Sequence, residues 1–241
     1  MTRHVTTRQT IAELQMAIRR CERTVVQARE EIVSTGSPGV DELLPAQGIR
    51  RGSLVEWLRT EEASGVVTLS LVVGRTVTPR ERPMVLIDRR RELFPPALQA
   101  MGIDVARLVW IHPRTESDAL WVCEESLRCP GVGLVWMTVD RLSGTGFRRL
   151  QLAAEEGRTV GFFVRPGIAA RQPSWADARL KVRPIASRET SFRYQIERAN
   201  CPGWPRRSGS EVLIDNVQGT IHDDFSERSR SRPADPLPVV S

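Results

Sequence analysis

The sequence predicts an α/β fold whose central sheet is mostly parallel and is covered by helices on both faces. Three observations predict it: a length of 241 residues, strand-sized runs that are apolar nearly throughout, and helix-patterned stretches that separate those runs. The predicted strands cover residues 53–58, 84–88, 108–112, 132–138 and 159–164. The predicted helices cover residues 65–77, 95–101, 117–129 and 145–156. A chain of this length can bury the core that such a doubly wound fold requires.

After Pro166 the pattern changes to strands that alternate apolar and polar residues without helices between them. These strands cover residues 178–185, 191–198 and 211–217. Alternation of this kind is typical of hairpin strands with one solvated face, so we expect them to extend one edge of the sheet in the antiparallel sense. From His222 onward the sequence is polar and rich in proline, which predicts a disordered tail over residues 222–241.

The N-terminal segment has the spacing of one amphipathic helix over residues 11–32. Its apolar residues recur at steps of three and four, and the candidate partner contacts among them are Leu14, Ile18 and Val25. The helix either docks on a partner or packs on its own domain. Ser37 and Pro38 then predict the N-cap and first residue of a short helix through Leu44. The expected organisation is a helix over 1–33, a core domain over 34–221 and the tail.

The charge balance is mildly basic and depends on arginine. Lys and Arg number 35 against 29 Asp and Glu, a net charge of +6, which permits contact with nucleic acid. Lys181 is the single lysine of the chain. Any reaction that needs a lysine must therefore use Lys181.

Metal and disulfide sites are not expected. The four cysteines form no C-x-x-C pair, and His4, His112 and His222 are too far apart in sequence for a zinc motif. No apolar run reaches the roughly 18 residues that span a bilayer, and the N-terminus has no signal-peptide core. We therefore expect a cytoplasmic protein with reduced thiols, no metal and no membrane contact.

Several short motifs occur together in a characteristic order. They are Val33–Gly36, Val40–Leu44, Gly48–Trp57 and the run from Val85 to Asp88 that continues to Pro113. Over about residues 33–200 the chain resembles the ATPase core of the RecA recombinase superfamily. Residues 148–157 and 164–166 make it most similar to the ImuA family of RecA-like, SulA-like accessory proteins. The resemblance implies a P-loop core and, as partners in translesion synthesis, a Y-family polymerase homologue and an error-prone replicative-type polymerase.

The same resemblance places the phosphate-binding loop between the first strand and the next helix. A working loop supplies a lysine for the phosphates and a hydroxyl for magnesium, but Val66 and Val67 stand at these positions and Thr68 comes one residue late. Glu61 and Glu62 add negative charge beside a triphosphate. The vestigial site, which is not expected to bind nucleotide, comprises Glu61, Glu62, Ser64, Gly65, Val66, Val67 and Thr68.

Two further ATPase positions are replaced. Arg90 stands where the family has the glutamate that activates water, and Thr138 stands at the carboxylate position that ends the strand over 132–138. An arginine cannot accept a proton as a general base. We therefore expect a pseudo-ATPase without cofactors.

Arginines mark the candidate contacts with DNA or a protein partner. In recombinases the two loops after the later core strands hold single-stranded DNA, but here the second loop spans only residues 166–176, so at most a weak contact is expected. Trp175 in this loop either stacks on a base or anchors the sheet edge. The candidate contacts are Arg141, Arg148, Arg149, Arg165 and Arg171.

The function expected from these observations is a non-catalytic RecA-like scaffold that recruits or organises a lesion-bypass polymerase complex. The N-terminal helix and the C-terminal strands are its expected binding surfaces. Two alternatives stay open: a cell-division inhibitor of the SOS response, and a DNA-stimulated ATPase with an unusual site. A monomer or hetero-complex is expected, because a RecA-like filament uses ATP at the subunit contact.

Overall fold

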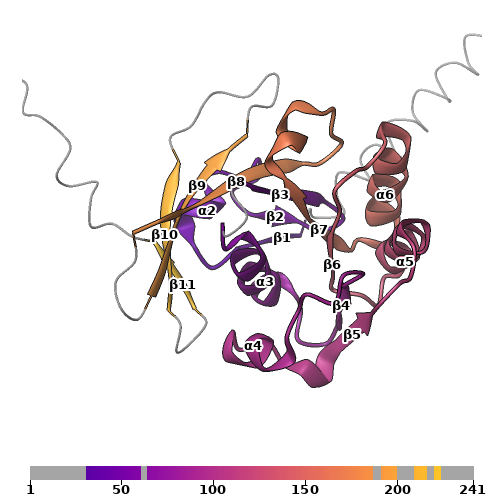
Figure 1. Cartoon of the computed structure of the whole chain (residues 1–241), viewed down its shortest axis with the longest axis horizontal. Helices are drawn as coiled ribbons and strands as arrows, with labels where there is room; N and C mark the ends of the chain where they lie inside the picture. Colours follow the sequence, from indigo (N-terminus) through magenta and orange to yellow (C-terminus); the bar gives the residue numbers. More distant parts are fainter. Residues whose placement is uncertain (1–30, 61–63, 187–190, 200–208, 216–219, 224–241) are drawn as a thin grey trace, which may run out of the picture. The chain divides into compact units, whose positions relative to one another are not determined.

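The computed structural model describes residues 31–60, 64–186, 191–199, 209–215 and 220–223 (Figure 1). The predicted N-terminal helix with Leu14, Ile18 and Val25 lies outside these residues, as do Glu61, Glu62 and residues 224–241. The compact unit described below begins at Ile32.

In the described part of the chain, nine strands form one mixed sheet in the order β11-β10-β9-β8-β3-β7-β6-β4-β5. The pairs among β3 to β8 are parallel, and the pairs β8–β9, β9–β10 and β10–β11 are antiparallel. The predicted α/β fold with an antiparallel C-terminal extension is confirmed, although this extension begins one strand later, because β8 runs parallel to β3. The strands are β3 (Leu54–Arg59), β4 (Met84–Ile87), β5 (Leu108–Ile111), β6 (Leu134–Thr138), β7 (Val160–Pro166), β8 (Ala178–Ile185), β9 (Ser191–Arg198), β10 (Ser210–Asp215) and β11 (Ile221–Asp223).

Helices cover both faces of the parallel strands. One apolar cluster joins α3 (Val66–Val77) and α4 (Pro95–Ala100) to one face, and the second joins α5 (Glu116–Arg128) and α6 (Gly144–Gly157) to the other. Figure 1 shows α3 on one side of β6 and β7 and the pair α5 and α6 on the other. Phe162 and Phe163 of β7 point to opposite clusters, where they meet Trp57 and Phe147 edge to face. This alternation explains why β7 is apolar from Val160 to Val164.

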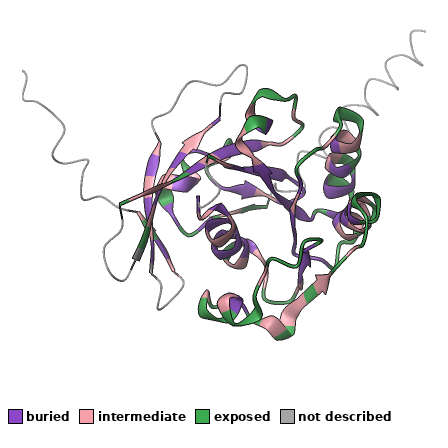
Figure 2. Cartoon of the chain, viewed as in Figure 1, coloured by how far each residue is buried: buried purple, intermediate pink, exposed green. Residues whose placement is uncertain are grey.

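The burial pattern separates the middle of the sheet from its β5 edge. Strands β3, β4 and β6 are buried along nearly their whole length, whereas β5 is half-buried (Figure 2). Short 3₁₀ segments, η1 (Val105–Arg107) and η2 (Gly167–Arg171), precede β5 and follow β7. The loops at the carboxyl end of the sheet therefore follow strands that are packed on both faces.

A two-stranded sheet near the start of the described chain shows that the predicted N-terminal helix ends before Ile32. Ile32 and Val33 form β1 (Ile32–Val33), which pairs with β2 (Ile49–Arg50), so the helix predicted over 11–32 cannot include Ile32. β-Branched side chains favour the extended backbone. The predicted cap of the next helix is correct: the Ser37 Oγ accepts from the Val40 amide, and Pro38 begins α2 (Pro38–Asp41), which ends three residues before Leu44.

The predicted tail begins too early. His222 and Asp223 belong to β11, and the Asp223 carboxylate accepts hydrogen bonds from the Ser37 hydroxyl and the Gly39 amide. These donors lie at the start of α2, where a negative charge is favourable. A polar residue thus holds the last described strand in place.

Candidate functional site

The strand and helix that flank the predicted phosphate-binding loop are present in the fold, and residues 61–63 of that loop lie outside the described residues. β3 ends at Arg59, and α3 begins at Val66 after Ser64 and Gly65. Gly65 is the N-cap residue and has a φ of +65°, a conformation that glycine adopts without strain. Val66 is buried in the core, whereas Val67 and Thr68 are half-buried. The helix N-terminus is therefore built as expected, but with apolar side chains at its first two positions.

Tyr194 of β9 fills the space above Gly65. A Cβ atom on Gly65 would lie 2.3 Å from Tyr194 Cε1 and 2.5 Å from its hydroxyl oxygen. Tyr194 itself is only 4% exposed. The hairpin of β8 and β9 brings it there, with Tyr194 opposite Pro184. The ring therefore covers Gly65 at the start of α3.

Sequence reasoning did not identify Tyr194 as part of this site. Tyr194 lies 129 positions after Gly65 in the chain, and nothing in the local pattern of either segment connects them. The available signal was its place among the alternating apolar residues of the predicted strand over 191–198.

Burial raises the pKa of Tyr194 to about 12. Because Tyr194 is the single tyrosine of the chain, phenolate absorbance during an alkaline titration reports this residue alone. We expect the folded protein to titrate near pH 12 and the denatured protein near pH ~10. The raised pKa stabilises the fold below pH ~10, and this contribution is lost as the pH rises towards 12. Titration of the folded protein at the denatured value would contradict burial of the ring.

Arginines surround the positions that the ATPase carboxylates occupy in the superfamily. Arg90 follows β4 and donates to the Asp140 carboxylate, and Arg59 Nη2 at the end of β3 lies 3.6 Å from the same carboxylate. Thr138 ends β6 without a charge. Asp140, two residues after Thr138, is thus paired with two cations.

The prediction that Arg165 contacts DNA or a protein partner is wrong. It is fully buried in β7, where it donates to Glu56 of β3 and, over 2.8 Å, to the Gln172 side chain. Arg179 of β8 donates to the second oxygen of Glu56. The single buried carboxylate of Glu56 is thus the shared counterion of two arginines within the sheet. Arg165 therefore cannot contact DNA or a partner from the surface.

Comparisons with known proteins identify the family. The RecA N-terminal domain profile matches residues 15–144. ImuA proteins from two strains of Caulobacter vibrioides are each 30% identical over 179 residues, which is 72% of this chain and 70% of theirs. The chain belongs to the ImuA family. Its described core is accordingly a RecA-like α/β domain.

RecA itself matches this ImuA-family protein over a shorter span. RecA of a Chelativorans species is 29% identical over 62% of this chain and 39% of its own length. RecA of Laribacter hongkongensis is 32% identical over 49% of this chain and 33% of its own. The chain thus spans little more than a third of these RecA proteins.

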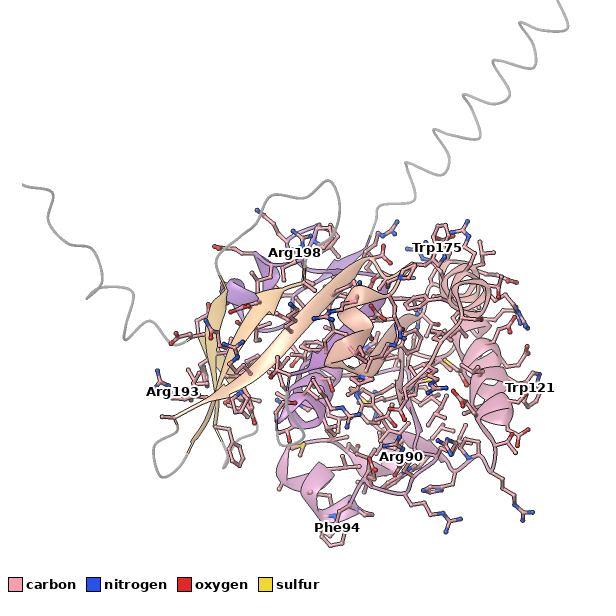
Figure 3. All side chains as sticks on the ribbon, turned by 45° about the horizontal axis from the view of Figure 1, so that its top comes forward. Arg90, Phe94, Trp121, Trp175, Arg193 and Arg198 are labelled. Atoms are coloured by element: carbon pink, nitrogen blue, oxygen red, sulfur yellow. The ribbon has the colours of Figure 1, made fainter. Side chains whose placement is uncertain are left out.

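The remaining predicted contacts of this ImuA-family protein lie in different surroundings. The Arg148 guanidinium lies 5.0 Å from the ring centre of Trp175, which is 48% exposed beside α6 (Figure 3). Arg149 is paired with Glu124 of α5 at 2.5 Å. Arg141 is exposed in the loop after β6, and Arg171 is exposed at the end of η2. Trp175 therefore stacks on an arginine of its own chain.

Within the described ranges, no helix is long and apolar enough to cross a membrane. Nor do the residues placed by the structure contain a group of three or more His, Cys, Asp or Glu side chains that could hold a metal ion.

Proposed function

We propose that this ImuA-family protein is a catalytically silent, cytoplasmic scaffold of DNA-damage-induced translesion synthesis. It recruits or organises an error-prone polymerase complex without binding or hydrolysing ATP. The observation that carries the proposal is the Tyr194 ring over Gly65, in the space that a nucleotide phosphate would need.

Steric and chemical arguments support the loss of nucleotide binding. Phosphates bind a helix N-terminus through backbone amides that the anion can reach. Here even one added carbon at Gly65 meets Tyr194 at 2.3 Å, so a phosphate would have to displace a buried side chain. Val66 and Val67 supply neither the amine nor the hydroxyl that the anion and its magnesium require.

The opposite side of the former site supports the same conclusion. Hydrolysis needs a carboxylate to orient or deprotonate the attacking water. Arg90 and Thr138 provide none, and the nearby Asp140 is paired with Arg90 and Arg59. A pseudo-ATPase follows from the combined replacements.

A retained fold around this silent site favours a protein-binding role. Both faces of the sheet keep closely packed apolar clusters, so the domain is still a stable platform. We propose that it binds a Y-family polymerase homologue and an error-prone replicative-type polymerase, as a monomer or hetero-complex. The proposed docking elements are the predicted N-terminal helix, through Leu14, Ile18 and Val25, and the C-terminal strands.

Affinity purification with the Y-family polymerase homologue tests the proposal. We expect association of equal strength with magnesium and ATP and without any nucleotide. Ile18→Gln is expected to weaken it about tenfold, because an apolar contact side chain is lost. Arg19→Gln, a substitution at the neighbouring position of the helix, is the matched control and should have little effect.

Two results would contradict the proposal. One is the absence of association at low salt when both proteins are folded. The other is an association that requires ATP, with a gain of about tenfold or more over the nucleotide-free sample.

A further inference from the structure

A pocket lies between the carboxyl ends of β4 and β6. The chain leaves β4 towards β5 through α4 on one face of the sheet, and it leaves β6 towards β7 through α6 on the other. Strands whose connections diverge in this way open a crevice in which α/β proteins bind ligands. The pocket measures about 240 Å³ and is lined by Arg89, Arg90, Glu116, Ala119, Met137, Thr138, Val139, Asp140 and Arg141.

The charges around this pocket favour an anion. Arg89, Arg90 and Arg141 line it, and Arg59 reaches its wall by pairing with Asp140. Only Asp140 and Glu116 oppose these four cations among the lining residues. Asp140 pairs with Arg90 and Arg59. Among the described residues, no carboxylate forms an ion pair with Arg89 or Arg141. Two guanidinium groups are therefore available to a ligand.

The backbone of the loop after β4 is held from inside the protein. The Asp88 side chain is buried and accepts from the amides of Glu92 and Leu93, each at 3.0 Å. Arg91 adopts a left-handed φ of +57° within this loop. These bonds fix the backbone positions of Arg89 and Arg90 beside the pocket. A fixed backbone lowers the conformational entropy that binding would otherwise lose.

We propose that this pocket binds phosphate groups, either as free phosphate anions or as the phosphodiesters of a nucleic acid. Arginine presents several N–H donors in a plane that matches two phosphate oxygens at once. Helix α5 begins beside the pocket, where Glu116 of its first turn is a carboxylate that a bound anion would meet. The volume is several times the roughly 30 Å³ that one water occupies, which leaves room for a phosphate.

This pocket does not include the closed position at Gly65. Strands β7 and β6 lie between β3, which leads to Gly65, and β4, which leads to the pocket. The phosphate proposal therefore does not depend on the scaffold function. The proposed ligand is an isolated phosphate group, so binding requires no adenine and no magnesium.

Titration of the full chain with inorganic pyrophosphate and, separately, with oligodeoxythymidylate tests the proposal. The double variant Arg89→Gln/Arg141→Gln is expected to weaken binding about tenfold or more, because two charge-assisted contacts are lost. Arg80→Gln/Arg183→Gln removes the same charge from exposed positions away from the pocket and should change binding less than about twofold. Asp140→Asn removes a competing anion and should strengthen binding.

The two probes distinguish the sources of phosphate. Pyrophosphate binding that is lost in the pocket variant supports a free anion as the ligand. Binding of oligodeoxythymidylate alone, weakened by the pocket variant but not by the control, supports a nucleic-acid phosphodiester. Equal losses in both double variants would overturn the proposal, because they would indicate diffuse charge attraction. The absence of binding to either probe would also overturn it.

Discussion

Glu56→Gln is expected to lower the free energy of unfolding by about 3–5 kcal/mol. Glu56 is fully buried, and each of its carboxylate oxygens accepts from a different arginine, Arg165 and Arg179. Removing the negative charge leaves two cations in the sheet interior without a counterion. The cost of an unpaired buried charge exceeds that of a lost surface pair by several kcal/mol.

Urea denaturation followed by circular dichroism measures this effect. Glu125→Gln is the matched control, because Glu125 is about half exposed and pairs with Arg128 at 2.8 Å on the surface of α5. That change should cost less than about 1 kcal/mol. Equal stability of the two variants would show that the Glu56 network does not stabilise the sheet.

Gly65→Ala is expected to be strongly destabilising in the native sequence and much less so when Tyr194 is alanine. Two effects add in the single variant: a left-handed φ for a residue with a Cβ costs about 1–2 kcal/mol, and the new Cβ would lie 2.3 Å from the Tyr194 ring. Tyr194→Ala removes only the second effect. The difference between the two backgrounds therefore measures how closely the ring covers Gly65.

A double-mutant cycle of Gly65→Ala and Tyr194→Ala provides this measurement from four denaturation curves. We expect the coupling free energy to be about 1–3 kcal/mol, since the two side chains would occupy the same space. Thr68→Ala, a half-buried change in the first turns of α3, is a control that should not couple to Tyr194→Ala. Coupling near zero at Gly65 would indicate that the ring does not fill the site.

The sequence predicted the elements best where the hydrophobic pattern extended over many residues. Helices α5 and α6 lie within one residue of their predicted ends, and the apolar strands β3 to β7 are all present. Short strands were harder to predict, because two residues in β1 and three in β11 are too few to show a hydrophobic period. Their backbone is held by distant partners, such as the contact from Asp223 to Gly39, and no local pattern reports such a partner.

The sequence shows which residue types occupy the vestigial nucleotide site, but it does not show which distant side chains contact them. The replacements at Val66 and Val67 can be read directly from the chain, whereas the Tyr194 ring over Gly65 depends on how β9 joins the sheet. Arg165 was expected in the loop after the strand over 159–164, where recombinases hold DNA, but it lies within β7. Its counterion is Glu56, 109 positions earlier, and only the parallel pairing of β3 with β7 brings the two together.

The arginine on β8 has a consequence for the segment that follows β7. While Arg179 is paired with Glu56, it also donates to the backbone carbonyls of Ala169, Ala170 and Gln172. Any swing of η2 away from the sheet would break these bonds and disturb a charge in the interior. The backbone from Ala169 to Gln172 is thus anchored to the sheet, close to Trp175. A molecule that binds this surface would lose little conformational entropy in ordering it.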